Sequence, residues 1–243
     1  MSQTRTNEQT QAGLPLVQAQ RLERLLSKPE GKLLVHEIYR SIQGESTFAG
    51  LPCVFVRLTT CMARCSWCDT PHAFQEGSIL ALDDVIEKVL AFDCPLVELT
   101  GGEPLLQVEA LQLMTVLADR ELTVLLETSG LISIEGVDSR VHIIMDLKCP
   151  DSNECENNLW SNLELLKPTD QIKFVIASRR DFDWTVDVIR RHGLDARFAV
   201  LLSGVFSRLK PRDLVEWLLE AKLHVRMQLQ LHKYIWDPAA RGV

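Results

Sequence analysis

The chain has 243 residues, of which 46% are hydrophobic and 24% are charged, and its 26 basic and 33 acidic residues give a net charge of −7. This balance lacks the basic character of nucleic-acid-binding domains, so we expect no nucleic-acid partner. No apolar run approaches the ~20 residues that cross a bilayer, and the polar N-terminus has no signal-peptide core. We therefore expect a cytoplasmic protein without a membrane partner, and the length is typical of one α/β domain.

Residues 1–32 are predicted to form a separate N-terminal arm, followed by one domain over residues 33–243. The arm begins with Thr, Gln and Asn, and we expect it to be flexible or to contain a short helix over residues 14–26. Pro29 and Gly31 would end that helix, because both residue types interrupt helical structure. We assign this arm no chemistry.

From residue 54 onward, runs of aliphatic and β-branched residues alternate with segments whose apolar residues recur at helical spacing. The runs predict strands over residues 54–58, 96–100, 122–126, 141–145, 171–176, 197–202 and 225–231. The helical spacing predicts helices over residues 82–90, 111–117, 159–166, 182–191 and 211–221. Such alternation forms a parallel sheet with right-handed crossovers. Because about six crossover units fall short of the eight in a closed barrel, the predicted fold is α/β, a partial (β/α)6 TIM-like barrel.

Three of the seven cysteines lie close together, where Cys61, Cys65 and Cys68 form a C-x3-C-x2-C pattern. An odd number of cysteines in a chain without a secretion signal favours metal binding or buried thiols over disulfides. Three thiolates can hold three irons of a cubic [4Fe–4S] cluster, whose full ligation takes four cysteines. The fourth iron is then open to a small molecule that is bound and reduced there, as S-adenosylmethionine radical chemistry needs.

The cysteine pattern alone leaves two other interpretations open. His72 follows at a spacing that would let it complete a Cys3His zinc site with the three thiolates. A disulfide between two of the cysteines, with the third left free, is less favoured because the rest of the chain is typical of an intracellular protein.

Polar residues gather directly after the predicted strands. In parallel α/β barrels the carboxyl ends of all strands meet at one mouth, where active sites form. The residues at these ends are Cys61, Thr100, Gly102, Glu103, Glu127, Asp146, Lys148, Ser203 and His232. Within the Gly-Gly-Glu-Pro turn at residues 101–104, two glycines would let the backbone approach a ligand, and the carboxylate could accept from an ammonium group. The alternative is a tight strand-to-helix turn with a surface carboxylate.

The pairing of C-x3-C-x2-C with Gly-Gly-Glu-Pro at residues 101–104 resembles the radical S-adenosylmethionine superfamily. The resemblance implies that the open iron takes the amino and carboxylate groups of the methionine part, with the Gly-Gly-Glu segment contacting its amino group. Reductive cleavage would give a 5′-deoxyadenosyl radical that abstracts hydrogen from a substrate. The resemblance also implies a partial barrel of the radical SAM type, and it disfavours zinc.

A narrower resemblance, covering about residue 35 to the C-terminus, is to the 7-carboxy-7-deazaguanine synthase family. The segments that carry it are residues 37–45, which end in Gln-Gly-Glu, Cys68-Asp69-Thr70, residues 100–104, residues 127–130 and residues 230–234. It implies a lyase that converts 6-carboxy-5,6,7,8-tetrahydropterin to 7-carboxy-7-deazaguanine with loss of ammonia, in queuosine and deazapurine biosynthesis. It further implies Mg²⁺, regeneration of S-adenosylmethionine, a flavodoxin or ferredoxin type reductant and a homodimer.

The same resemblance assigns roles to individual residues, with no catalytic side chain certain beyond the cluster ligands. Cys61, Cys65 and Cys68 would ligate the cluster, and Thr70 would ligate Mg²⁺ through its hydroxyl, a hard oxygen. The residues implied to contact S-adenosylmethionine are Trp67, Cys68, Asp69, Gly102, Glu103, Glu127, Asp146, Lys148 and Ser203. Those implied to contact the pterin are Ile42, Gln43, Gly44, Arg57, Thr100 and the terminal carboxylate of Val243.

Two positions depart from the family pattern: Asp146-Leu147-Lys148 stands where many members have Ser-Pro-Lys, and Ser203-Gly204 replaces their Gln-Pro. The main alternative is another radical enzyme, such as a glycyl-radical activase acting on a protein. Arg57 favours a small carboxylated substrate, because a guanidinium pairs bidentately with a carboxylate, although a surface ion pair is the simpler interpretation without the resemblance. A non-enzymatic electron-transfer or zinc protein is disfavoured by the three-cysteine pattern and the Gly-Gly-Glu-Pro turn.

Overall fold

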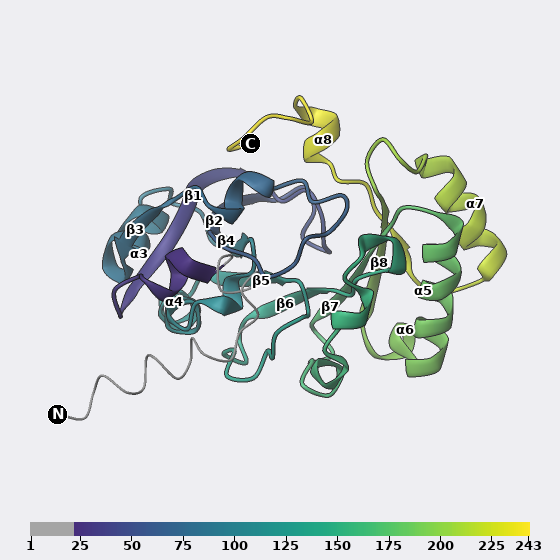
Figure 1. The fold of residues 1–243 in the computed structure, drawn as a ribbon, viewed down its shortest axis with the longest axis horizontal. Coiled ribbons are helices and arrows are strands. Elements are labelled where there is room, and N and C mark those ends of the chain that lie inside the picture. Colours follow the sequence, from purple (N-terminus) through teal and green to yellow (C-terminus); the bar gives the residue numbers. More distant parts are fainter. Residues whose placement is uncertain (1–21) are drawn as a thin grey trace.

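The computed structural model describes residues 22–243, which form one open nine-stranded sheet flanked by helices (Figure 1). The strand order is β3-β1-β2-β4-β5-β6-β7-β8-β9. The strands are β1 (Lys32–Ile42), β2 (Pro52–Leu58), β3 (Ser78–Ala81), β4 (Leu96–Gly101), β5 (Thr123–Thr128), β6 (His142–Asp146), β7 (Gln171–Ile176), β8 (Ala199–Gly204) and β9 (Arg226–Met227). Neighbouring strands from β2 to β9 are parallel, and β1 pairs antiparallel with β2 and β3. Because β3 and β9 remain as edges, the sheet does not close, and the predicted partial barrel is confirmed.

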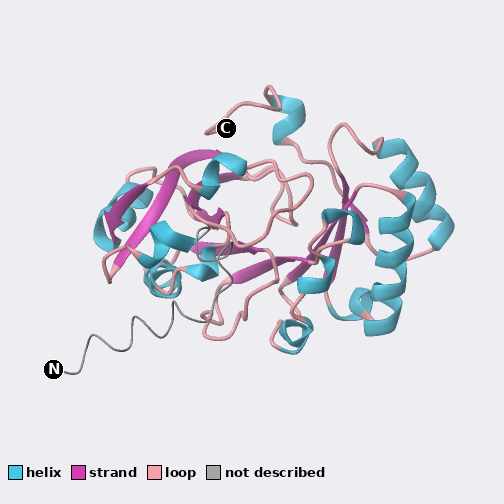
Figure 2. Ribbon diagram, in the orientation of Figure 1, coloured by secondary structure: helices cyan, strands magenta, loops and turns pink. Residues whose placement is uncertain are grey.

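Helices cover the sheet at both of its ends (Figure 2). They are α3 (Leu82–Leu90), α4 (Glu109–Asp119), α5 (Arg179–His192), α6 (Leu194–Arg197), α7 (Pro211–Ala221) and α8 (His232–Ile235). Short 3-10 turns add η1 (Pro71–Phe74), η2 (Pro104–Leu106), η3 (Pro150–Ser152), η4 (Cys155–Asn157) and η5 (Trp160–Glu164). α3 and α4 pack near β1 and β5, whereas α5 to α7 pack near β7 to β9. Within residues 22–243, every helix is too short or too polar to cross a membrane.

The elements with strong local signals have the predicted bounds. β7, α3 and α7 match the predicted ranges. α7 begins at Pro211, and proline suits this position because an N–H in the first turn has no partner within the helix. α5 is longer than the predicted range of residues 182–191, because it begins after Ser178, whose hydroxyl accepts from the Asp181 amide at 3.3 Å. It ends at Gly193, whose positive φ of 58° suits a residue without a Cβ.

The helix predicted over residues 159–166 is wrong, since this segment forms only the 3-10 turn η5. The buried Asn162 side chain donates to the Ile132 carbonyl at 2.8 Å and accepts from the Ile134 amide at 3.2 Å. These bonds tie the segment to the loop between β5 and β6. Pro168 then prevents a helix from continuing, because proline restricts the residue before it and lacks an N–H.

The last strand is also shorter than the predicted range of residues 225–231, because β9 contains only Arg226 and Met227. The chain then leaves the sheet, and the Leu231 amide donates to the Gly44 carbonyl at 2.9 Å. β1 and β3 have no counterpart among the predicted elements. β1 pairs antiparallel with β2 across the connection of residues 43–51. β3 pairs antiparallel with β1, a segment distant in the chain, which local patterns do not reveal.

Only part of the predicted N-terminal arm lies among the described residues. Residues 22–26 are helical, and the rest of the helix predicted over residues 14–26 lies outside them. Leu22 is buried, and the Lys28 ammonium lies 2.7 Å from the Glu109 carboxylate at the start of α4. The described part of the arm thus packs against the domain, and the predicted boundary at residue 32 stays a prediction.

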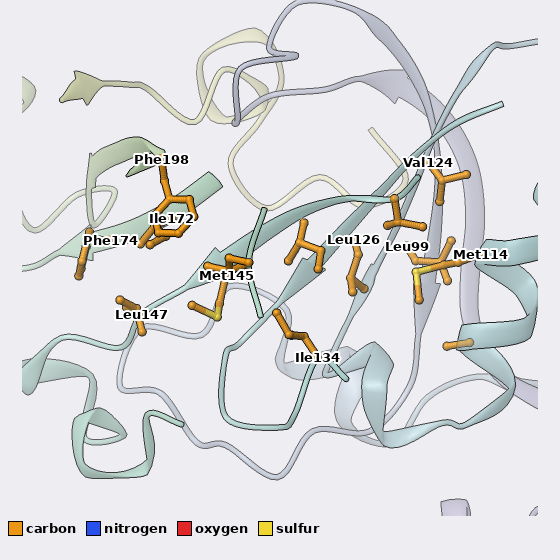
Figure 3. Packing of buried hydrophobic residues seen from close by; sticks show 14 of the residues in the cluster. Leu99, Met114, Val124, Leu126, Ile134, Met145, Leu147, Ile172, Phe174 and Phe198 are labelled. Atoms are coloured by element: carbon orange, nitrogen blue, oxygen red, sulfur yellow. The ribbon is translucent and has the colours of Figure 1, made fainter. Parts of the chain in front are cut away.

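The main core lies between the sheet and its outer helices. Alternate residues of the central strands enter it, and Figure 3 shows Leu99, Leu126 and Met145 packed in a row with Met114 of α4 nearby. The intervening residues face the inside of the barrel. Near the base they form a second apolar cluster of Cys53, Phe55, Leu96, Leu125 and Ile144. Toward the carboxyl ends of the strands the inward-facing residues become polar, which positions a site at that end.

Truncating the core should destabilise the protein in proportion to its burial. Leu99→Ala removes a fully buried side chain from β4 and should lower the free energy of unfolding by about 2–5 kcal/mol. Leu219→Ala is the matched control, because Leu219 is 73% exposed on α7, and it should change stability by less than about 0.5 kcal/mol. Urea unfolding of both variants under anaerobic conditions measures the difference, and equal losses would contradict the assigned core.

Candidate active site

A cavity of about 470 Å³ opens at the carboxyl ends of the parallel strands. It is lined by most of the residues that the sequence predicts for the site: Ile42, Gln43, Gly44, Arg57, Cys61, Cys65, Trp67, Cys68, Asp69, Thr70, Thr100, Gly102, Glu127, Asp146, Lys148 and Val243. Glu103 and Ser203 do not line it, and both are fully buried. The structure therefore brings residues from Ile42 to Val243 together at one mouth.

The cysteine loop runs from the end of β2 to η1 on one wall of this cavity. Cys61 is buried, and Cys65 and Cys68 are partly exposed. Backbone hydrogen bonds hold the loop in place, since the Ser66 amide donates to the Ser152 carbonyl at 3.0 Å and the Thr60 amide donates to the Ala73 carbonyl at 2.8 Å. Neighbouring segments thus fix the loop before any metal is considered.

The three thiols are not gathered as tightly as ligands around a single zinc ion. Within the described residues they do not form a group whose ligand atoms all lie within 4.8 Å of one another. A tetrahedral zinc ion with Zn–S bonds of about 2.3 Å needs sulfur atoms only about 3.8 Å apart. His72, the candidate fourth zinc ligand, instead groups with His36 and Glu37. The geometry therefore does not favour a preformed single-zinc site, and the assignment of the three cysteines to a [4Fe–4S] cluster stays a prediction.

The surroundings of Cys61 and Cys65 favour their protonated thiol form when no metal is bound. Burial raises the pKa of Cys61 to about 12, and the nearby Glu103 carboxylate adds to the rise. Burial also raises the pKa of Cys65, against the opposing effect of the Lys148 ammonium. Because metals bind thiolates, cluster loading must release these protons.

The Gly101-Gly102 pair allows the next strand end to pack against the cysteine loop. A Cβ on Gly101 would lie 2.2 Å from the Leu58 carbonyl oxygen, and one on Gly102 would lie 2.2 Å from the Thr60 carbonyl oxygen. Without these side chains, the Gly102 amide donates to Leu58 at 3.0 Å and the Glu103 amide donates to Thr60 at 2.8 Å. Both positions therefore require glycine for this close backbone packing, and both also line the cavity.

Glu103 joins this turn to the end of β5. Its carboxylate accepts from the Leu105 amide at 3.0 Å, the Ser129 amide at 2.7 Å and the Thr128 hydroxyl at 2.9 Å, and it also contacts the Ser129 hydroxyl. The alternative of a surface carboxylate is thus wrong, because Glu103 is fully buried and multiply hydrogen-bonded. Its contact with S-adenosylmethionine stays a prediction, as does that of Ser203, whose buried hydroxyl has no partner among the described residues.

A buried ammonium surrounded by partly buried carboxylates forms the cavity floor. The Lys173 ammonium lies 2.8 Å from Glu45, contacts Glu127, and is 4.0 Å from Asp146. Burial alone would lower the pKa of Lys173, but the Glu127 and Glu45 carboxylates raise it well above its usual value. Burial would likewise raise the pKa of Glu127, but the Lys173 ammonium outweighs it and lowers that pKa. Both groups therefore remain ionised inside the protein.

Lys173 and Glu45 are cavity residues that the sequence analysis does not select. Lys173 interrupts the otherwise buried strand sequence Gln-Ile-Lys-Phe-Val-Ile, and a charged residue at an inward position of such a strand is the signal that would have found it. Glu45 directly follows Gln43 and Gly44 in the segment that carries the narrower resemblance. Glu98 is a third such residue, on the inner face of β4.

Arg57 of β2 and Gln43, just after β1, also line the cavity. Arg57 donates to Glu37 at 2.8 Å and to the Tyr39 hydroxyl at 2.9 Å, so its guanidinium is oriented by two fixed acceptors. Gln43 donates to the Glu98 carboxylate at 2.8 Å. Burial and the charge of Glu127 raise the pKa of Glu98 well above its usual value, so this wall offers both donors and acceptors.

The C-terminal segment lies across the mouth, where Figure 1 shows α8 above the curved sheet. His232 packs on Gly44, where a Cβ would come within 2.6 Å of its Nδ1 atom. Gln230 donates to Glu45 at 2.9 Å, and the Lys233 ammonium lies 2.9 Å from Asp69. His232 thus has a packing role that explains why Gly44 carries no side chain.

The family model described as Radical SAM superfamily matches residues 56–205, which run from β2 through the cysteine loop to the loop after β8. The partial barrel and the three-cysteine loop at its mouth are the two features of that class found here. The fold and the site therefore define a radical S-adenosylmethionine protein.

Individual relatives point to one family within this superfamily. The 7-carboxy-7-deazaguanine synthase of Chlorobaculum tepidum is 48% identical over 217 residues, which cover 88% of this chain and 99% of that protein. The synthase of the same name from Koribacter versatilis is 42% identical over 225 residues, covering 86% and 99%. The crystal structure of QueE from Escherichia coli matches with a TM-score of 0.69 at 21% identity, covering 83% of this chain and 95% of that one, which supports the fold. This chain belongs to the 7-carboxy-7-deazaguanine synthase family.

Removing the Lys173 ammonium should destabilise the protein in a way that depends on pH. Lys173→Met should lower the free energy of unfolding by about 1–3 kcal/mol at pH 8, because the partly buried carboxylates of Glu45 and Glu127 would lose their counter-charge. In the variant the pKa of Glu127 would rise above its unfolded value of about 4.3, so stability should fall as pH rises through the raised pKa. The loss should therefore be smaller at pH 5 than at pH 8.

Urea unfolding of wild type and Lys173→Met at both pH values measures this effect. Lys210→Met is the matched control, because Lys210 is exposed before α7 and its loss should change little at either pH. A loss that is the same at pH 5 and pH 8 would contradict the charge balance described here.

Proposed function

We propose that this chain converts 6-carboxy-5,6,7,8-tetrahydropterin to 7-carboxy-7-deazaguanine and ammonia, as a lyase of queuosine or deazapurine biosynthesis. The observation that carries the proposal is one cavity lined both by the three cysteines and by the Arg57 and Gln43 wall. Its volume of about 470 Å³ suits a small molecule and a cofactor fragment better than a folded protein partner. The glycyl-radical activase alternative is therefore not favoured.

The chain uses a [4Fe–4S] cluster and S-adenosylmethionine, as its superfamily does, and we assign the cluster to Cys61, Cys65 and Cys68. When bound, these groups supply a 5′-deoxyadenosyl radical that abstracts hydrogen from the substrate. The residues proposed to hold S-adenosylmethionine around that cluster include Trp67 and Asp69 on the cysteine loop, and Asp146 and Lys148 at the end of β6. The Lys148 ammonium lies 2.9 Å from the Asp146 carboxylate, so this pair is already oriented toward the cavity.

The substrate carboxylate is proposed to pair with Arg57, whose orientation by Glu37 and Tyr39 reduces the entropy lost on binding. Gln43 and Glu98 offer an amide and a carboxyl group that match the donors and acceptors on a pterin edge. Thr100 donates to Glu127 at 3.2 Å, which connects the substrate wall to the buried charges. Ile42, Gly44 and Val243 complete the proposed substrate contacts.

Mg²⁺ is proposed to bind through the Thr70 hydroxyl, because Mg²⁺ prefers hard oxygen ligands and completes its shell with substrate oxygens or water. Thr70 lines the cavity between the cysteine loop and η1, with its hydroxyl 4.0 Å from the Cys68 sulfur. A flavodoxin or ferredoxin type reductant, a homodimeric state and a cytoplasmic location are further parts of the proposal.

The reaction and the cluster can be tested together. Reconstituted protein with S-adenosylmethionine, Mg²⁺, dithionite and the carboxytetrahydropterin should form 7-carboxy-7-deazaguanine, read by mass spectrometry under anaerobic conditions. Cys65→Ala should abolish the product and lower the iron content, because one iron loses its only protein ligand. Cys94→Ala should retain both, since Cys94 is buried away from the cavity lining. Formation of deoxyadenosine without the deazaguanine would contradict the substrate assignment but still support a radical enzyme.

The carboxylate contact can be tested separately. Arg57→Gln should raise the KM for the pterin roughly 10- to 150-fold, because a charge-assisted hydrogen bond contributes about 1.5–3 kcal/mol. Arg40→Gln on the same sheet should leave KM unchanged, since Arg40 is exposed on β1. Steady-state kinetics with matched iron content decide the question, and an unaltered KM in Arg57→Gln would remove Arg57 from the substrate site.

A further inference from the structure

Three side chains that commonly ligate metals gather at the rim of the cavity, and none of them is a cysteine. One candidate ligand atom from each of His36, Glu37 and His72 lies within 4.8 Å of the other two, and all three residues are half-buried. The ring centroids of His36 and His72 are 4.9 Å apart with the planes tilted by 44°, so the rings are not stacked face to face. Their nitrogen-bearing edges are thus close enough for small side-chain rotations to bring them onto one ion.

An irregularity in β1 explains how two consecutive residues reach the same point. In a regular strand, neighbouring side chains point to opposite faces. Here the register between β1 and β2 shifts between Val35, which pairs with Leu58, and Glu37, which pairs with Arg57. His36 is therefore the extra residue of a β-bulge, and bulges redirect side chains in this way. The bulge places His36 and Glu37 together beside His72 of η1.

Neighbouring groups orient two of these side chains through hydrogen bonds. The His36 Nδ1 atom lies 3.2 Å from the Glu76 carbonyl oxygen, so a neutral ring would donate there and keep Nε2 as its ligand atom. Glu37 uses one oxygen, Oε1, to accept from Arg57 at 2.8 Å, while Oε2 faces the C-terminal segment at Gly242. Each of the two residues thus has one atom fixed by the protein and a second atom to offer.

The local charges are balanced before any ion binds. The Arg57 guanidinium pairs with Glu37, and the Arg241 guanidinium lies 3.1 Å from the Glu76 carboxylate. An added dication would be repelled by both guanidiniums and attracted by both carboxylates. Binding must therefore come from direct ligand bonds rather than from a negative field, which favours ions that bond strongly to imidazole.

We propose that His36, Glu37 and His72 form a binding site for a divalent transition-metal ion of the Zn²⁺ type. Two imidazoles and one carboxylate with an open fourth position are a ligand set that zinc adopts in proteins. Mg²⁺ does not suit this set, because it prefers oxygen ligands. The site is therefore distinct in chemistry from both the cysteine loop and the oxygen ligand at Thr70.

An ion bound at this site would affect the cavity through Glu37. The same carboxylate orients Arg57, and both residues line the cavity with His72. If the proposed function holds, zinc at this site would change the affinity for the carboxylated substrate, and substrate would change the affinity for zinc by the same factor. The metal site itself does not depend on that function.

The test uses the holoenzyme with its iron–sulfur cluster reconstituted, so that the cysteines are occupied. Zn²⁺ is titrated anaerobically in competition with a chromophoric chelator, and the zinc-loaded protein is examined by X-ray absorption at the zinc edge. We expect one tight equivalent per chain, with nitrogen and oxygen neighbours at about 2.0–2.1 Å and no sulfur at about 2.3 Å.

Two single variants assign the ligands, and His224→Gln serves as the control because His224 is exposed far along the chain after α7. His36→Gln and His72→Gln should each weaken Zn²⁺ binding at least about tenfold, while the control binds as wild type does. Iron content and thermal unfolding show whether each variant is folded, and either one alone suffices if the other is not. Unchanged zinc affinity in a folded variant, absence of a tight equivalent, or sulfur neighbours around the zinc would each overturn the proposal.

Discussion

The buried Lys173 ammonium is the charge around which the cavity is organised. It joins Glu45 from the turn between β1 and β2 to Glu127 at the end of β5, with Asp146 of β6 at 4.0 Å. A charge removed from water is tolerated only when opposite charges and hydrogen bonds surround it. These segments must therefore pack together in the folded protein. The turn that carries Glu45 and the strand ends then have fixed positions relative to each other.

A second constraint is the close backbone packing between the cysteine loop and the turn after β4. Gly101 and Gly102 let this turn donate two hydrogen bonds to the end of β2 and the start of the loop. Glu103 then carries the connection onward to Ser129 at the end of β5. Successive parallel strands thus support the loop that carries the proposed cluster ligands. This support can fix the positions of the ligands although the loop has no regular secondary structure.

Much of the architecture follows from local patterns in the chain. The apolar spacing of residues 82–90 and the proline at residue 211 predict α3 and α7, and the strand ends correctly indicate one polar rim. The expected chemistry of that rim came from the pairing of two short motifs, whereas the cysteine spacing alone left zinc and iron–sulfur interpretations open. The two kinds of signal therefore contribute different parts of the site.

The features that sequence reasoning missed depend on contacts between distant residues. Lys173 and Glu45 are 128 residues apart, and nothing near either one reveals the other. The Asn162 side chain overrides a helical apolar pattern by bonding to the loop after β5. Similarly, β9 stops after two residues because the following chain bonds to Gly44 instead of continuing in the sheet.

The way the C-terminal segment crosses the mouth has a dynamic consequence. Its contacts with the rim include one backbone hydrogen bond from Leu231, a side-chain bond from Gln230 and the packing of His232 on Gly44. Two partly exposed ion pairs, of Lys233 with Asp69 and of Arg241 with Glu76, add to them. Polar contacts of this kind contribute little each, whereas the strands beneath are held by a continuous apolar core. Local opening should therefore release this segment long before the barrel unfolds, so that molecules can enter and leave while the strand ends stay assembled.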